Sequence, residues 1–171
     1  MLIPGQKVPD LSLPLTIQAR FELSKQKPQS FTMLIFYRGS HCPMCREYLE
    51  EIAARLGDIT DAGLSPFAIS MDSEERAMVV NREWQTGDLP LVYDLAEDEA
   101  RRWGLYISAK REGSQEPETF SEPGLFLVRQ DLTLFFAQVQ SGPFTRPSID
   151  QLLEGVRLAV ENDYPARGTA T

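Results

Sequence analysis

The sequence contains few thiols and little imidazole, with two cysteines and one histidine among 171 residues. Both cysteines lie in one short segment, so no distributed set of thiols is available for a secreted disulfide framework. A structural zinc site normally takes four cysteine or histidine ligands, and a single pair with one histidine does not supply them within one chain. We therefore expect neither a disulfide scaffold nor a metal or organic cofactor.

The sequence also lacks an excess of positive charge and any long apolar run. Its 17 lysines and arginines face 25 acidic residues, a net charge of -8, which is the wrong sign for holding a phosphate backbone. The longest nearly apolar runs, residues 31–37 and 132–137, fall far short of the roughly 20 residues that span a bilayer. No basic region followed by an apolar stretch opens the sequence. We expect no nucleic-acid or membrane partner and a cytoplasmic location.

What the sequence does have is a normal globular composition, with 42% hydrophobic residues in 171. One domain for roughly 150 residues is the usual proportion, and a chain of this length can bury a sizeable core. No linker, repeat or low-complexity tract divides it. The expectation is a single domain over residues 1–171.

The most informative segment is C-P-M-C, which contains Cys42 and Cys45. It follows the apolar run F-T-M-L-I-F-Y and opens a segment of helical periodicity at about residues 43–56. Cys45 falls on the apolar face of this helix. Cys42 lies at the first turn, where free N–H groups and the helix dipole favour an anion such as a thiolate. Pro43 suits the first helical position, where its missing N–H has no partner in any case.

This arrangement predicts two unequal thiols, with Cys42 attacking and Cys45 resolving. Arg38 and His41 precede Cys42 and are candidates for lowering its pKa. Two other interpretations are a structural disulfide, which would close too small a loop to stabilise much, and a metal-binding dimer that shares two cysteine pairs. A C-x-x-C pair within strand and helix patterning favours redox function.

The rest of the chain alternates strands and helices. A strand at 64–70, a helix after Asp72 and Ser73, a strand at 89–94 and a helix at 95–103 are expected in turn. Polar residues 108–122 are typical of an exposed, mobile loop. A hairpin of 124–128 and 132–139 and a helix capped by Ser148 complete the pattern, which predicts an α/β fold with a central mixed sheet flanked by helices.

The segment F-Y-R-G-S-H-C-P-M-C-R at 36–46 resembles the thioredoxin superfamily, and within it the alkyl hydroperoxide reductase/thiol-specific antioxidant, or peroxiredoxin-like, group. V-P-D-L-S-L at 8–13 and E-P-G-L-F-L-V at 122–128 add to the resemblance. It implies a thioredoxin-like fold with an N-terminal extension at 1–30, a core at 31–163 and a β-α insert near 89–122.

The resemblance further implies an antioxidant thiol oxidoreductase that reduces hydroperoxides or disulfides and is regenerated by a thioredoxin- or glutathione-type reductant. Proteins of this group often associate, so a homodimer, with a contact in a loop such as 141–147, is a further expectation. The alternative is a redox-responsive binding module without efficient turnover, which would engage its partner through the surface near 108–122.

The family motif P-x-x-x-T-x-x-C does not fit either cysteine. With Cys42 as its cysteine, the proline and threonine positions hold Ile35 and Gly39; with Cys45, they hold Arg38 and Cys42. The choice between peroxide and disulfide as oxidant therefore stays open.

The family arginine that precedes the G-L-F strand is also missing, because Pro123 stands there. Arg38 and Arg146 are the candidates to replace that arginine. Pro123 itself resembles the thioredoxin-type proline, which implies a cis peptide bond that exposes the backbone of Glu122 to an extended substrate. Glu122 and Pro123 are therefore the predicted substrate-binding residues.

Overall fold

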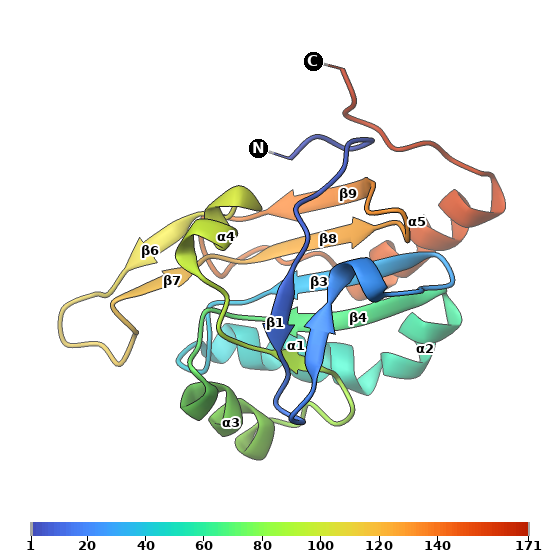
Figure 1. Cartoon of the computed structure of the whole chain (residues 1–171). Helices are drawn as coiled ribbons and strands as arrows, with labels where there is room; N and C mark the ends of the chain where they lie inside the picture. The colour runs from blue at the N-terminus through green and yellow to red at the C-terminus, as the bar shows by residue number, and fades with distance from the viewer. Residues whose placement is uncertain (1, 171) are drawn as a thin grey trace.

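A five-stranded mixed sheet forms the centre of the computed structural model, which describes residues 2–170 (Figure 1). Its order is β5-β4-β3-β8-β9, in which β3, β4 and β5 are parallel and β8 and β9 are antiparallel additions. The strands are β3 (Phe31–Phe36), β4 (Leu64–Ile69), β5 (Leu91–Val92), β8 (Gly124–Val128) and β9 (Leu134–Val139). The predicted mixed sheet is confirmed.

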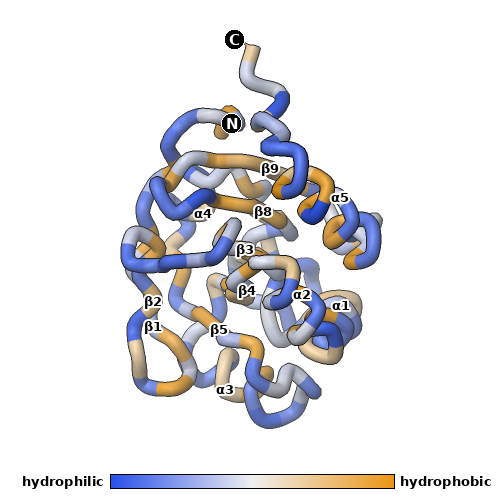
Figure 2. Tube along the Cα trace, turned by 90° about the vertical axis from the view of Figure 1, so that its right-hand side faces the viewer, coloured by the Kyte–Doolittle hydropathy of each residue, from blue (hydrophilic) through white to orange (hydrophobic). Residues whose placement is uncertain are grey.

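Helices cover this sheet unequally. They are α1 (Pro43–Ala54), α2 (Leu56–Asp61), α3 (Glu74–Glu83), α4 (Glu97–Arg102) and α5 (Ile149–Glu161), with a 3-10 turn, η1, at Leu23–Lys25. Figure 2 shows α1, α2 and α5 on one side of the sheet, and α4 with the N-terminal hairpin on the other. No helix within residues 2–170 has the length and apolarity needed to cross a membrane.

The two sides contain separate hydrophobic cores because successive residues of a strand point to opposite faces. Met33 and Ile35 of β3 pack in the cluster that contains α1 and α5, whereas Leu34 and Phe36 pack in the cluster of the N-terminal hairpin and α4. Every residue of β3 is buried. This central strand therefore fixes the point at which the chain leaves the sheet for the C-P-M-C segment.

Two small hairpins flank the sheet. The first pairs β1 (Ser12–Pro14) with β2 (Arg20–Glu22), and the second pairs β6 (Ile107–Ala109) with β7 (Thr119–Ser121). The first agrees with the expected N-terminal extension. The second corrects the expectation of an exposed loop at 108–122 in part. Residues 110–118 do form a mostly exposed connection, but both ends of the stretch are strands, and Glu116 and Phe120 are buried.

Helix ends differ modestly from the sequence prediction. The helix expected at 43–56 stops at Ala54, and α2 follows after a break at Arg55. On α5, Leu153 and Val156 are buried, whereas Val160 in the last turn is 51% exposed.

Candidate active site

Cys42 lies where β3 gives way to α1. It is the N-cap residue of α1, and its Sγ accepts a hydrogen bond of 3.2 Å from the backbone N–H of Cys45. Pro43 occupies the first helical turn, as predicted. The two cysteines approach each other to 2.7 Å, and no disulfide joins them in this structure. The local sequence thus places one sulfur at a helix N-terminus, where an anion is favoured, and a second thiol beside it.

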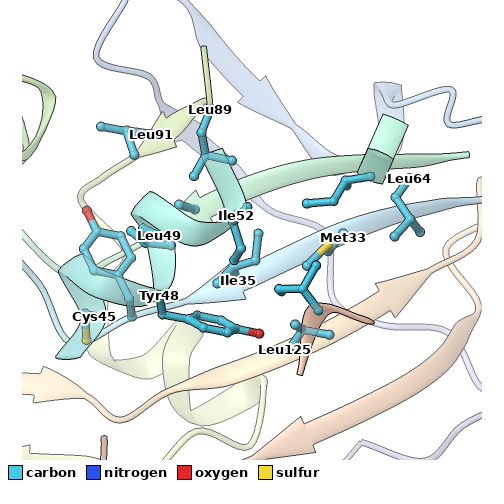
Figure 3. Close-up of a cluster of buried hydrophobic side chains, with 14 of the residues drawn as sticks. Met33, Ile35, Cys45, Tyr48, Leu49, Ile52, Leu64, Leu89, Leu91 and Leu125 are labelled. Atoms are coloured by element: carbon cyan, nitrogen blue, oxygen red, sulfur yellow. The ribbon is translucent and has the colours of Figure 1, made fainter. Parts of the chain in front are cut away.

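Cys45 belongs to the buried face of α1. Figure 3 shows it on the same helix as Tyr48, Leu49 and Ile52, at the end of the cluster that these side chains form under the sheet. The inward orientation of Cys45 is the one that the helical periodicity predicts. Its neighbours in the core hold the thiol in place.

The two thiols differ in acidity. A hydrogen bond from the Cys45 thiol is the largest influence that lowers the pKa of Cys42 to about 6, assisted by the Cys45 N–H and by the charges of Arg38 and Arg146. Burial raises the pKa of Cys45, and donation to Cys42 raises it further. Near neutral pH the pair therefore consists of a Cys42 thiolate and a Cys45 thiol.

Arg146 reaches the pair from the loop before α5. Its Nη2 donates to Sγ of Cys45 at 3.1 Å, and its guanidinium stacks over the ring of Tyr48 at 5.2 Å. The hydroxyl of Tyr48 in turn donates to the carbonyl of Pro147 at 2.9 Å. These contacts hold the loop against α1 and place a fixed positive charge beside both sulfurs.

Arg38 occupies a second, more enclosed position. Its side chain is 14% exposed, with Nη2 at 3.5 Å from Glu116 and Nε at 3.3 Å from Glu122. Its guanidinium also lies over the ring of Phe120 at 4.6 Å. The hydrogen bonds of Arg111 lower the pKa of Glu116 to about 2, so this carboxylate is ionised. The β6–β7 hairpin thus supplies the counter-ions of an arginine next to the active cysteine.

His41 is a neutral side chain in this setting. Burial, followed by the charges of Arg38 and Arg76, lowers the pKa of His41 to about 4. Its Nδ1 lies 3.4 Å from Nη2 of Arg76, and its ring meets the edge of Phe120 at 4.7 Å. His41 therefore brings no positive charge to Cys42, and its supporting role stays a prediction.

Asp72 fixes the loop between β3 and α1. Its buried carboxylate accepts from the backbone N–H of Ser40 at 2.7 Å and from Nε of Arg76 at 3.0 Å. Burial raises the pKa of Asp72. Gly39 has φ +122, and a Cβ there would lie 2.6 Å from Oδ1 of Asp72. Only glycine suits this close approach.

The expectation of a cis bond before Pro123 is wrong, because no cis peptide occurs within residues 2–170. The backbone on both sides of the proline is already hydrogen-bonded within the protein. The N–H of Glu122 donates to the carbonyl of Tyr106 at 2.8 Å, and the carbonyl of Pro123 accepts from the backbone N–H of Gln140 at 3.0 Å. A trans bond lets β7 continue almost directly into β8. Substrate binding by Glu122 and Pro123 stays a prediction.

Several residues around the cysteines escaped the sequence analysis. Glu116 and Phe120 lie in a polar stretch with no periodic pattern. The sequence placed Asp72 before a helix but did not indicate its contact with the loop that carries Ser40. Arg146 was one of two arginine candidates, and the structure puts it against Cys45 while Arg38 pairs with acids. No group of three or more histidine, cysteine or acidic side chains within residues 2–170 is arranged to hold a metal ion.

Comparison with known structures finds the same fold in peroxiredoxins. Peroxidoxin BcpB from Mycobacterium tuberculosis matches with a TM-score of 0.73 and 20% identity, over 92% of this chain and 98% of that one. The mitochondrial 2-Cys peroxiredoxin from Plasmodium falciparum matches with a TM-score of 0.72 and 16% identity, over 94% and 96%. No curated protein sequence gives a significant match.

The family assignment comes from the sequence itself. The model of the AhpC/TSA family matches residues 4–136, which is most of the chain and includes both cysteines. The peroxiredoxin-like resemblance and the thioredoxin-like fold are thereby confirmed. The chain belongs to the AhpC/TSA family, and it is a peroxiredoxin-like thiol oxidoreductase with antioxidant function.

Proposed function

We propose that this enzyme reduces hydroperoxides through a cycle of the Cys42 and Cys45 thiols. The observation that supports this most directly is the position of Cys42, which is the N-cap of α1 and accepts from the N–H of Cys45 at 3.2 Å. A thiolate is the nucleophilic form of cysteine, and this position favours it at neutral pH.

In the first step the Cys42 thiolate attacks the terminal oxygen of the hydroperoxide. The O–O bond breaks, Cys42 becomes a sulfenic acid, and the remaining alkoxide takes a proton and leaves as an alcohol, or as water when the substrate is hydrogen peroxide. Two electrons pass from sulfur to peroxide. The charges of Arg38 and Arg146, which already favour the thiolate, are placed to stabilise the negative charge that moves onto the leaving oxygen.

In the second step Cys45 attacks the sulfur of the Cys42 sulfenic acid, which forms the disulfide and releases water. Cys45 must lose its proton here, although burial raises its pKa. The charge of Arg146 opposes that increase, and its Nη2 lies 3.1 Å from the sulfur. Arg146 therefore assists both steps. In this proposal it replaces the family arginine, whose position before β8 is occupied by Pro123 in this sequence.

Access favours a hydroperoxide over a protein disulfide as the oxidant. Cys42 is only 1% exposed, so the disulfide of a folded protein would need a large opening to reach it, whereas a small peroxide needs little. Reduction of the Cys42–Cys45 disulfide by an external thiol requires the first turn of α1 to open. We expect a thioredoxin- or glutathione-type reductant that acts once this turn has opened after oxidation, and a reducing compartment such as the cytoplasm suits it. A homodimer stays a prediction.

The assignment of the two cysteines is tested by trapping the intermediate. One equivalent of hydrogen peroxide is added anaerobically to the reduced Cys45→Ser variant in the presence of dimedone, and the adduct is located by peptide mass spectrometry. The proposal predicts rapid labelling of Cys42, which is the only thiol of this variant. The matched Cys42→Ser variant should react slowly, because its remaining thiol is protonated. Rapid labelling of Cys45 in that variant would reverse the roles.

A further inference from the structure

A cavity of about 800 Å³ lies between β9 and α5, outside the cysteine pair. The cavity is lined by the N-cap residue Ser148 and, on α5, by two adjacent pairs one turn apart and the next residue in the series: Gln151, Leu152, Gly155, Val156 and Ala159. This spacing places them on one side of the helix. At the helical rise, the span from Ser148 to Ala159 is roughly 16 Å, so the cavity is a groove along the length of α5.

Small residues keep the groove open. A Cβ built on Gly155 would meet no atom within 4 Å, so nothing in the fold requires a glycine there. Glycine is a poor residue for the interior of a helix, and any larger side chain would help the helix form. A side chain at position 155 would instead project into the groove, which gives a reason for its absence.

The charge of the groove is opposite to that of the chain. Arg146 and Arg167 line it, and no aspartate or glutamate is among its lining residues in the described chain, whose net charge is -8. In residues 2–170, Nε of Arg146 is buried and has no hydrogen-bond partner, while its Nη2 contacts Cys45. Arg146 precedes Ser148 by two residues, so its guanidinium gives this end of the groove a positive charge.

We propose that this groove binds an unbranched amphiphilic monocarboxylate, with its alkyl chain along α5 and its carboxylate at Arg146. Apolar pockets with a few polar groups at one end orient such molecules, and a guanidinium pairs well with a carboxylate. Leu152 and Val156 supply apolar contacts for the chain. Binding does not rest on the proposed peroxidase cycle, but the ligand and Cys45 share Arg146, which couples the groove to the redox pair.

The test is isothermal titration calorimetry of the reduced protein with dodecanoate below its micellar concentration. Dodecyltrimethylammonium, which has the same chain and the opposite charge, is the control ligand. We expect saturable binding of dodecanoate and at least about tenfold weaker binding of the cation. Binding of both probes with equal affinity, or of neither, would overturn the proposal.

Variants locate the site. Gly155→Leu fills the groove, and Gly57→Leu is its matched control, because Gly57 also lies in a helix with open space around a built Cβ but does not line the cavity. Gly155→Leu should weaken dodecanoate binding about tenfold or more, and Gly57→Leu should leave it unchanged. Equal affinity in these two folded variants would contradict the proposal. The titration needs no peroxide and no turnover, so a failure of the peroxidase cycle would not affect this result.

Discussion

The low pKa of Cys42 depends on the thiol beside it, and this dependence can be measured. Replacement of Cys45 by alanine removes the side-chain donor, whereas replacement by serine keeps an O–H in a similar place. The backbone N–H of residue 45, at 3.2 Å from the Cys42 sulfur, remains in both variants. The pair of variants therefore isolates the hydrogen bond that contributes most to the pKa.

A hydrogen bond to a charged group stabilises it by about 1.5–3 kcal/mol, which corresponds to roughly one to two pKa units. The pKa of Cys42, about 6 in the wild type, should therefore rise to roughly 7–8 in Cys45→Ala and stay low in Cys45→Ser. Ultraviolet thiolate absorbance against pH gives the value directly, since each variant contains a single cysteine. Identical pKa values in the two variants would refute the role of the side-chain donor.

Three further predictions concern the same site. The rate of oxidation by hydrogen peroxide should rise with pH through the Cys42 pKa of about 6 and level off above it; a steady rise to alkaline pH would contradict a preformed thiolate. Because folding lowers the pKa of Cys42, its thiolate stabilises the folded protein above the ordinary thiol pKa, and this contribution is lost as pH falls through about 6. Denaturant unfolding of the wild type and of Cys42→Ser, at a pH below 6 and at a pH above the ordinary thiol pKa, measures this contribution to the free energy of unfolding. Gly39→Ala should cost about 1–3 kcal/mol because φ is +122 and Asp72 lies against the new Cβ, and an unfolding midpoint equal to that of the wild type would rule this out.

The local features of the site could be predicted from the sequence. An apolar run before C-P-M-C and helical periodicity after it place Cys42 at the N-cap of α1 and turn Cys45 inward, because both properties depend on residues that are close in the chain. The same reasoning gave β3, β4 and the β8–β9 hairpin.

The surroundings of the two cysteines depend on contacts between distant segments. Arg146 meets a sulfur 101 positions earlier in the chain, and Glu116 pairs with an arginine 78 positions before it. Residues 108–122 have the composition of a loop, yet their two ends belong to β6 and β7. Glu116 and Glu122 pair with Arg38, and Phe120 packs against the guanidinium of Arg38. Such partners cannot be predicted from the composition of the segment itself.

The central claim, that the Cys42–Cys45 pair reduces hydroperoxides, is tested most directly by anaerobic stopped flow. Reduced protein is mixed with one equivalent of hydrogen peroxide or, in parallel, of a small disulfide, and the product is identified by intact mass. The account predicts oxidation by peroxide far faster than that of a free thiolate, with formation of an intramolecular disulfide and loss of this rate in Cys42→Ser. Slow reaction with peroxide together with rapid disulfide exchange would contradict it.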